Sequence, residues 1–340
     1  MGTTASTAFV TQGSGGSGGE ASTSSSGSGL VISPVRTKVL AAKMTVPFLK
    51  SDTDAPSQCW TLWSESVPPK MEIPAGESLR YRALASADFA LTEWAMDGPQ
   101  NAVVQRMVDF FWAVGAPAHQ IDLLNDAGVR LNPARLGSWT RLSAAGAMDA
   151  GWAFCERVPL DQALAVVRRG DVTDAVAQWA AAHGVAACRE VTHDVSGIPP
   201  QTTQLRVELP GADAAAQLAV AADALARFRM PALPDAVAAL LRTCPTTAAE
   251  PLQLVLSLTE TTVTAAAVHV PAPPAALVPP LLDFAHGAKD TYERFATGLG
   301  SPVPHFVLVT CTAPGVGNTM YKEGFDVLFG WNVGDETLDS

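Results

Sequence analysis

Short runs in which apolar and polar residues alternate come in pairs along this chain, and stretches with helical spacing follow the pairs. Alternation of this kind predicts strands, because successive side chains of a strand point to opposite faces. Two such runs joined by a short turn predict a hairpin. The expected strand pairs are residues 58–66 with 78–86, 137–146 with 149–158, 188–197 with 203–211, 251–259 with 262–271, and 304–314 with 318–331.

Ala- and Leu-rich runs separate these pairs and predict amphipathic helices. Asp161 and Asp213 stand where helices should begin, and Gly115, Gly184 and Gly300 stand where helices should end. The expected helices are residues 100–115, 160–170, 171–184, 213–228, 233–244 and 276–300.

Hairpins joined through helices predict an α+β fold with a largely antiparallel sheet. In the run from 203 to 209, Gln204 and Arg206 share one face and Leu205 and Val207 share the other. The apolar face can pack under helices, and the polar face is either the wet side of an open sheet or the lining of a barrel. A closed antiparallel barrel surrounded by helices is the favoured prediction, because closure removes the exposed strand edges.

The first 35 residues differ from the rest of the chain. They are rich in Gly, Ser and Thr and cannot bury enough apolar surface to offset their ordering entropy, so residues 1–35 are predicted to be a disordered tail. The recurring pattern beyond them predicts one domain over residues 36–340. The start MGTTAS matches an N-myristoylation pattern at Gly2, but a tail of small residues produces such a match easily by chance.

A formal net charge of -11 and a pI near 4.9 argue against nucleic-acid binding, which requires a dense basic surface. No apolar run is long enough to predict a membrane span. The five cysteines are scattered without metal-ligand spacing, so we expect reduced thiols, no zinc and a cytoplasmic protein.

Several arginines lie on predicted strands. Arg80 and Arg82 are two residues apart and must share a face, and Arg141, Arg206 and Lys322 also occupy strand positions. On an open sheet these would be solvated surface charges. Inside a barrel they would converge, and arginine forks match phosphate oxygens, which predicts a diphosphate site.

The chain resembles the soluble aromatic prenyltransferases of the ABBA-barrel superfamily, in particular the indole prenyltransferases, in the order of its elements and in three runs. SLRYRALAS resembles an early strand whose arginine contacts the prenyl diphosphate, which implies that role for Arg80. QLRVELP resembles a middle strand with a basic diphosphate ligand, which implies Arg206. AAAVHVP resembles a later strand, with Ala267 in place of the family's base and His269 in place of its shielding tyrosine.

The resemblance implies transfer of a prenyl group from an allylic diphosphate to an aromatic small-molecule or peptide acceptor. It implies a carboxylate as general base, for which Glu65 is preferred over Glu72 because Glu65 falls within a strand-like run. No cofactor is implied, and magnesium is left open. The implied diphosphate ligands and aromatic shield together are Arg80, Arg82, Arg141, Arg206, Lys322, Tyr81, Trp139, Trp152, His269 and Tyr321.

A second function stays open: a non-catalytic barrel or sheet protein that binds an apolar small molecule or a partner chain. The scarcity of the family's lysines and tyrosines favours this alternative, whereas arginines on several strands favour the enzyme. Three or more cations that converge on one interior point would separate the two functions. The acceptor, the prenyl chain length and the oligomeric state are not predicted.

Overall fold

The structure is a computed structural model, and it describes residues 78–86, 90–113, 115–143, 148–154, 156–166, 170–195, 201–246, 250–285, 287–315 and 324–333. The predicted tail, the predicted domain start at residue 36 and the predicted strand 58–66 lie outside this part. They stay predictions.

Within the described residues, the strands form one 11-stranded sheet in which every neighbouring pair is antiparallel. Their bounds are β1 (Ser78–Ala85), β2 (Ala90–Pro99), β3 (Arg135–Ser143), β4 (Met148–Phe154), β5 (Val158–Pro159), β6 (Ala187–Asp194), β7 (Thr203–Glu208), β8 (Gln253–Leu258), β9 (Val263–Pro271), β10 (Phe306–Thr312) and β11 (Gly324–Val333).

Pairs of helices separate most of the hairpins. Their bounds are α3 (Gln100–Ala113), α4 (Ala118–Leu131), α5 (Leu160–Val166), α6 (Asp171–His183), α7 (Ala214–Arg227), α8 (Asp235–Leu241), the short 3-10 helix η1 (Ala275–Leu277), α9 (Val278–Phe284) and α10 (Ala288–Gly298). The order of hairpin and helix pair repeats along the chain, as the hydrophobic pattern predicts. Among the helices of this part, none is both long and apolar enough to cross a membrane.

Local signals account for several helix ends. The Asp213 side chain accepts a hydrogen bond from the Ala216 N–H at 2.8 Å and so satisfies a free donor at the start of α7. Gly184 ends α6 with a φ of 72°, a left-handed conformation that a residue without a Cβ adopts at little cost. Both ends confirm predictions made from single residues.

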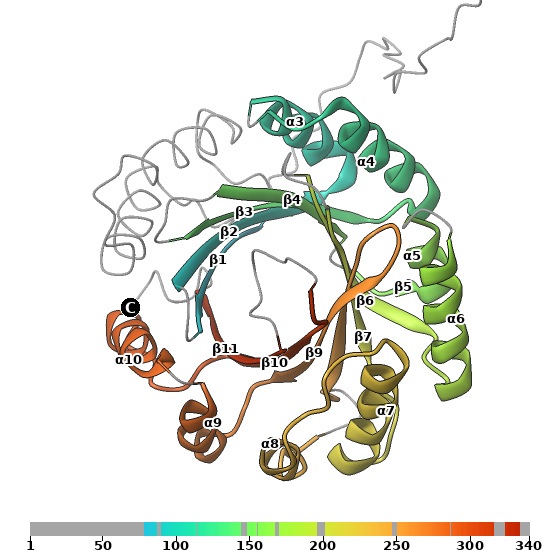
Figure 1. Cartoon of the computed structure of the whole chain (residues 1–340). Coiled ribbons are helices and arrows are strands. Elements are labelled where there is room, and N and C mark those ends of the chain that lie inside the picture. Colours follow the sequence, from blue (N-terminus) through green and yellow to red (C-terminus); the bar gives the residue numbers. More distant parts are fainter. Residues whose placement is uncertain are drawn as a thin grey trace, which may run out of the picture.

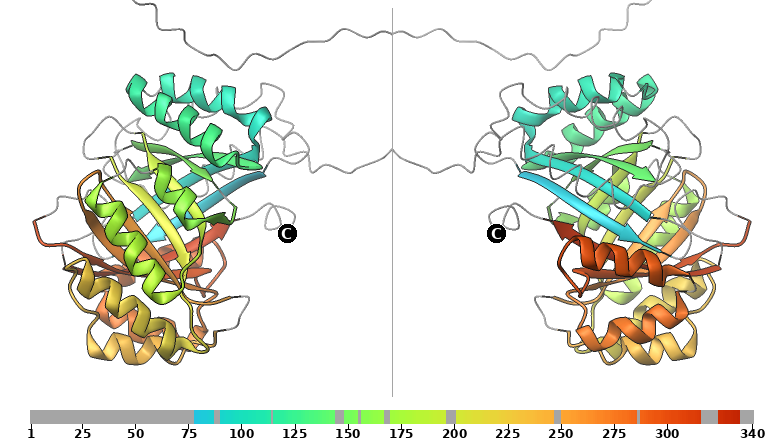
Figure 2. Two further views of the ribbon diagram at one scale, coloured as in Figure 1. Left: turned by 90° about the vertical axis from the view of Figure 1, so that its right-hand side faces the viewer. Right: turned by 90° about the vertical axis from the view of Figure 1, so that its left-hand side faces the viewer.

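The sheet is curled, and the helices lie outside it (Figure 1). β1 and β11 are neighbours in the middle of the sheet, and β4 pairs with β3 along one edge and with β6 along the other. The side views show the helices along the outside of the strands (Figure 2). The structure is therefore α+β, with a curled antiparallel sheet whose convex face is covered by helices.

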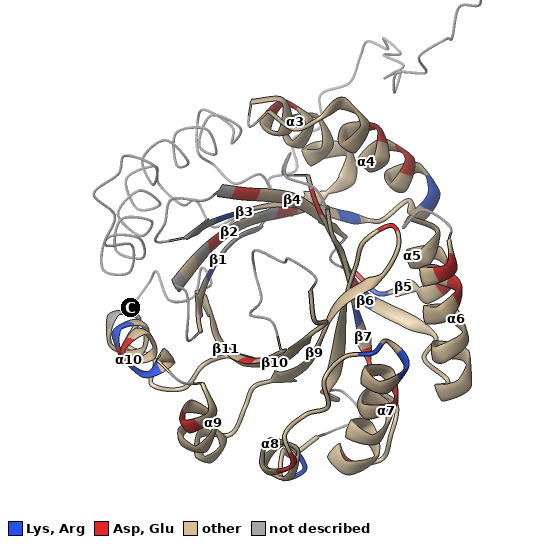
Figure 3. Ribbon diagram, in the orientation of Figure 1, with Lys and Arg blue, Asp and Glu red and all other residues tan. Residues whose placement is uncertain are grey.

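The two faces of each strand have different surroundings. On β7, Leu205 and Val207 are fully buried in the main core between sheet and helices, whereas Gln204 and Arg206 face the other way and are half-buried. Burial of the apolar face against helices is the main stabilising contribution, and it fixes the strand register. Charged residues accordingly lie on strands as well as on helix surfaces (Figure 3).

One predicted hairpin is wrong. Strand β1 was expected to pair with residues 58–66, but its two neighbours are β2 and β11. Both edges of β1 are therefore occupied, which leaves no place for another strand. The run that forms β2, ALTEWAMDGP, was not expected to be a strand.

Candidate functional site

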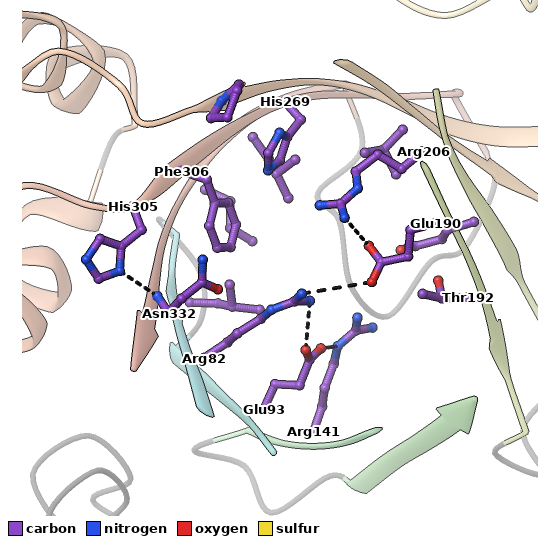
Figure 4. A pocket seen from close by; sticks show the side chains of 16 residues that line it. Arg82, Glu93, Arg141, Glu190, Thr192, Arg206, His269, His305, Phe306 and Asn332 are labelled. Atoms are coloured by element: carbon purple, nitrogen blue, oxygen red, sulfur yellow. Dashed lines mark hydrogen bonds and ion pairs between the residues drawn. The ribbon is translucent and has the colours of Figure 1, made fainter. Parts of the chain in front are cut away.

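The concave side of the sheet encloses a cavity of about 180 Å³, which we call the chamber. Its lining side chains come from strands that face one another across the cavity and from residues next to these strands (Figure 4). They are Arg82, Leu84, Glu93, Arg141, Glu190, Thr192, Gln204, Arg206, Val255, His269, Pro271, His305, Phe306, Leu308, Leu328 and Asn332.

Glu93 on β2 lies between two arginines. It is directly across from Arg82 on β1 and from Arg141 on β3, so the register of three neighbouring strands brings the charges together. Arg82 Nη1 donates to Glu93 Oε1 at 3.0 Å, and Arg141 Nε donates to Glu93 Oε2 at 2.6 Å. Burial alone would raise the pKa of Glu93, but the charges of Arg141 and Arg82 outweigh it and lower this pKa.

Glu190 on β6 also lies between two arginines, but only one of them is on a neighbouring strand. Arg206 is directly across from it on β7, with Nη2 2.9 Å from Glu190 Oε2. Arg82 reaches from β1, a strand that does not pair with β6, and places Nη2 3.9 Å from Glu190 Oε1. The Arg82 side chain therefore joins two separate walls of the chamber (Figure 4).

A bulge in β6 gives Glu190 this orientation. The pairing of β6 with β7 shifts register between Cys188 and Glu190, so Arg189 is an extra residue in the strand. Cys188 is fully buried on the helix side, and strict alternation would put Glu190 on that side as well. The bulge turns Glu190 to the concave side instead, as bulges commonly re-aim a side chain.

The charged residues of the chamber form one chain of contacts, Arg141–Glu93–Arg82–Glu190–Arg206. Three guanidinium groups and two carboxylates leave a formal charge of +1. In a partly water-excluded site these charges interact more strongly than they would at the surface. The chamber is therefore weakly cationic and rich in N–H donors.

The opposite wall of the chamber is mostly apolar. The His269 ring stacks on Phe306 with ring centroids 5.3 Å apart. Burial and the nearby Arg206 lower the pKa of His269 to about 3, so the imidazole is neutral at physiological pH. Phe306 lies over Gly330, its cross-strand partner, where an added Cβ would be 2.0 Å from the ring. The glycine is thus required for the position of the ring.

A second aromatic residue lies beside the arginines. The Arg141 guanidinium is 4.1 Å from the centroid of the Trp139 ring, a cation–π contact. Trp139 lies over its cross-strand partner Gly151, where an added Cβ would be 2.2 Å from the indole. The same pairing of an aromatic ring over glycine thus occurs on two walls.

Four of the residues predicted for the site line the chamber, namely Arg82, Arg141, Arg206 and His269. Trp139 contacts one of them. Trp152 does not reach the chamber and corrects the expectation that it shields a ligand: on β4 it faces the helices, fully buried beside Phe154 and His193. Alternation in the strand puts residues 150, 152 and 154 on that side.

The structure does not describe the side chains of the other predicted site residues. Arg80 and Tyr81 lie on β1, but only their backbone is described. Glu65, Tyr321 and Lys322 lie outside the described residues. The sequence reasoning missed Glu93, Glu190 and Phe306. Glu190 and Phe306 lie in runs that the sequence predicts to be strands, whereas Glu93 lies outside every predicted strand.

A metal site is not evident in the part of the chain that the structure describes, where no three His, Cys, Asp or Glu residues cluster suitably. Glu93 and Glu190 are engaged by arginines on both oxygens. Any divalent ion would have to compete with these contacts. The donor set fits an anion better than it fits a cation.

Comparison with known proteins shows which family the chain belongs to. No family model matches the sequence. A PH domain-containing protein of Dictyostelium discoideum is 35% identical over 306 residues, which cover 90% of this chain and 67% of that protein. The chain belongs to the family of that protein. The name of this relative describes a domain and gives no activity.

Solved structures of aromatic prenyltransferases share the fold. A 6-dimethylallyltryptophan synthase from Micromonospora olivasterospora, in complex with DMASPP and Trp, has a TM-score of 0.61 at 12% identity, over 89% of this chain and 97% of that one. A 5-dimethylallyltryptophan synthase from Streptomyces coelicolor has a TM-score of 0.61 at 10% identity, over 90% and 98%. This chain therefore has the architecture of the aromatic prenyltransferases, as its sequence predicts.

Proposed function

We propose that the protein binds an allylic diphosphate in the chamber and transfers its prenyl group to an aromatic acceptor. The observation that carries the proposal is the convergence of Arg82, Arg141 and Arg206 from separate strands on one interior cavity. A plain apolar carrier has no need of buried guanidinium groups, which cost free energy to desolvate. The fold shared with solved prenyltransferases supports the same function.

We also infer that the β4–β6 pairing closes the sheet into a barrel. Each strand from β1 to β4 and from β6 to β11 then has a neighbour on both sides, and no open edge is left among them. A closed barrel excludes bulk water from its interior, and this strengthens the interaction of the arginines with an anion.

The proposed reaction assigns a task to each wall. The bond between the prenyl carbon and the diphosphate oxygen breaks, and its electron pair leaves with the diphosphate, whose charge Arg82, Arg141 and Arg206 stabilise. The π electrons of the acceptor ring form the new carbon–carbon bond. Phe306, which lines the chamber, would shield the allylic cation, and Trp139, which contacts Arg141 beside it, would assist. The ring proton passes to a carboxylate, for which Glu65 stays our candidate.

The non-catalytic alternative rests on one observation. Glu93 and Glu190 already neutralise most of the arginine charge, as expected of a structural ion-pair network. In that case the chamber would bind an uncharged apolar molecule and would have no affinity for diphosphates.

Calorimetric titration with dimethylallyl thiolodiphosphate, with and without magnesium, separates the two functions. We expect binding by the wild type and its loss in an Arg82→Ala/Arg206→Ala double variant. Arg227→Ala is the matched control, because this exposed arginine on α7 contacts Gln178 far from the chamber. Equal affinity in the double variant, or no binding by the folded wild type, would contradict the proposal. Binding would justify a screen of aromatic acceptors for prenylated products.

A further inference from the structure

Glu190 occupies the point of the chamber where arginines from two walls meet. Its two carboxylate oxygens face different guanidinium groups, Oε1 towards Arg82 at 3.9 Å and Oε2 towards Arg206 at 2.9 Å. Two oxygens of one anion between two arginine forks is also the arrangement by which a phosphate group would bind. The side chain stands where a ligand anion would be expected (Figure 4).

Glu93 has the same chemistry but a different position. It lies within the wall, between the two strands that flank β2, and both its arginines are direct cross-strand neighbours. Glu190 has one such neighbour, Arg206, and its second contact crosses the interior. Its place on the concave side also depends on the bulge at Arg189. A local distortion of the strand thus brings a carboxylate into the interior.

The size and the charge of the chamber agree with an occupied site. A volume of about 180 Å³ is below the roughly 300–1,000 Å³ typical of small-molecule sites. Movement of the Glu190 side chain would enlarge the cavity and leave Arg82 and Arg206 facing one another across it. Arg206 would then lose its contact with Glu190 while Arg82 would keep its contact with Glu93, and both guanidinium groups would have N–H donors to offer an incoming anion.

We propose that Glu190 is an internal occupant of the anion site, which an incoming diphosphate displaces by taking over the contacts with Arg82 and Arg206. This inference rests on the proposed function and adds a residue that sets ligand specificity. A ligand must bring enough anionic oxygens to replace a carboxylate already held by two arginines. Diphosphates meet this requirement, and carboxylates and other weakly charged anions are excluded.

The test is calorimetric titration with inorganic pyrophosphate of the wild type, Glu190→Gln and Glu208→Gln. Glutamine keeps the shape of Glu190 and removes its charge. Glu208 is the matched control, because it lies two residues from Arg206 on the same strand but contacts Arg189 and Arg157 and lines a different cavity. We expect Glu190→Gln to bind pyrophosphate about tenfold tighter or more, and Glu208→Gln to bind as the wild type does.

The outcomes distinguish the two proposals. Wild-type binding that is unchanged or weakened in Glu190→Gln would overturn the role of Glu190 and leave the diphosphate site intact. Absence of pyrophosphate binding in the wild type and in Glu190→Gln would overturn the site itself. If Glu190→Gln does not fold, as judged by thermal unfolding, Glu190→Asp replaces it. The shortened side chain keeps the charge but withdraws from Arg82, and it should bind more tightly than the wild type.

Discussion

The two sides of the chamber differ in polarity. One side, on β1, β2, β3, β6 and β7, carries all the arginines and carboxylates of the lining. The other, formed by β8 to β11 and the residue before β10, carries mainly apolar side chains together with His269, His305 and Asn332. The charged side is formed by Arg82, Glu93, Arg141, Glu190 and Arg206, and the apolar side by Val255, His269, Phe306, Leu308 and Leu328.

The difference shows how one cavity can hold a ligand with two unlike ends. A phosphate group is stable only where donors replace its hydration, and a hydrocarbon chain is stable only where water is excluded. The curled sheet brings both surfaces together because strands that are far apart in the sequence face one another across the chamber. Arg82 and Phe306 thus face the same cavity. Changes confined to one side should therefore affect one end of the ligand.

The largest expected effect is on the charged side. Glu93→Ala leaves Arg82 and Arg141 without the buried carboxylate between them, since Glu93 is only 2% exposed. Loss of one member of a buried ion pair typically costs about 3–5 kcal/mol of unfolding free energy. Chemical denaturation measures it, with Glu208→Ala as the partly exposed control. A loss of less than about 1 kcal/mol, the size expected of a surface ion pair, would show that these charges are not a buried network.

Arg206→Ala should weaken pyrophosphate binding by about tenfold to a hundredfold, because hydrogen bonds to charged groups contribute about 1.5–3 kcal/mol each. Arg206 is half-buried, so the fold should survive. Calorimetry measures the affinity, and the Arg227→Ala variant should match the wild type. An unchanged affinity would mean that the charged side does not bind phosphate.

Two buried histidines, His269 on the apolar side and His193 on the helix side of β6, should make folding sensitive to acid. Burial and Arg206 lower the pKa of His269 from 6.5 to about 3, and burial lowers the pKa of His193 to about 4. The unfolded chain therefore takes up protons below pH 6.5 that the folded protein excludes, so the unfolding free energy falls as the pH falls from 6.5. His269→Gln should reduce this slope by about 1.4 kcal/mol per pH unit. Denaturation at pH 7, 6 and 5 measures it, and identical slopes would contradict it.

The smallest expected effect separates the two sides most sharply. Gly330→Ala puts a methyl group against the Phe306 ring, which lines the cavity and has to shift to make room. We expect a loss of about 1 kcal/mol in stability, at the low end of the cost of overpacking. Affinity for dimethylallyl thiolodiphosphate should fall while affinity for pyrophosphate stays the same. Gly170→Ala is the control, because the nearest atom to its added Cβ is 3.7 Å away. Equal losses for both ligands would contradict the separation.

Much of the fold could be predicted from the sequence because burial on one face leaves a clear alternation. On β7 burial alternates strictly, with Leu205 and Val207 packed under helices, and this strand is predicted correctly. β2 was missed because its faces are not distinct: Leu91, Glu93, Ala95 and Asp97 share the concave side and mix apolar with acidic residues.

The site was predictable only in part. Alternation put Arg82, Arg141 and Arg206 on polar faces, and the structure brings them to one cavity. Their glutamate partners depend on cross-strand register and on the bulge at Arg189, and neither can be read from the periodicity of a single strand. Trp152 was misplaced because an aromatic residue on a strand suits either face.

The proposed ligand of the chamber is an allylic diphosphate, bound between its two sides. A crystal structure of the protein with dimethylallyl thiolodiphosphate tests it most directly. We expect the diphosphate within hydrogen-bond distance of Arg82 and Arg206, Glu190 turned away from both, and the prenyl chain against Phe306. Crystals grown with saturating ligand that show Glu190 still between the two arginines, and no ligand in the chamber, would contradict it.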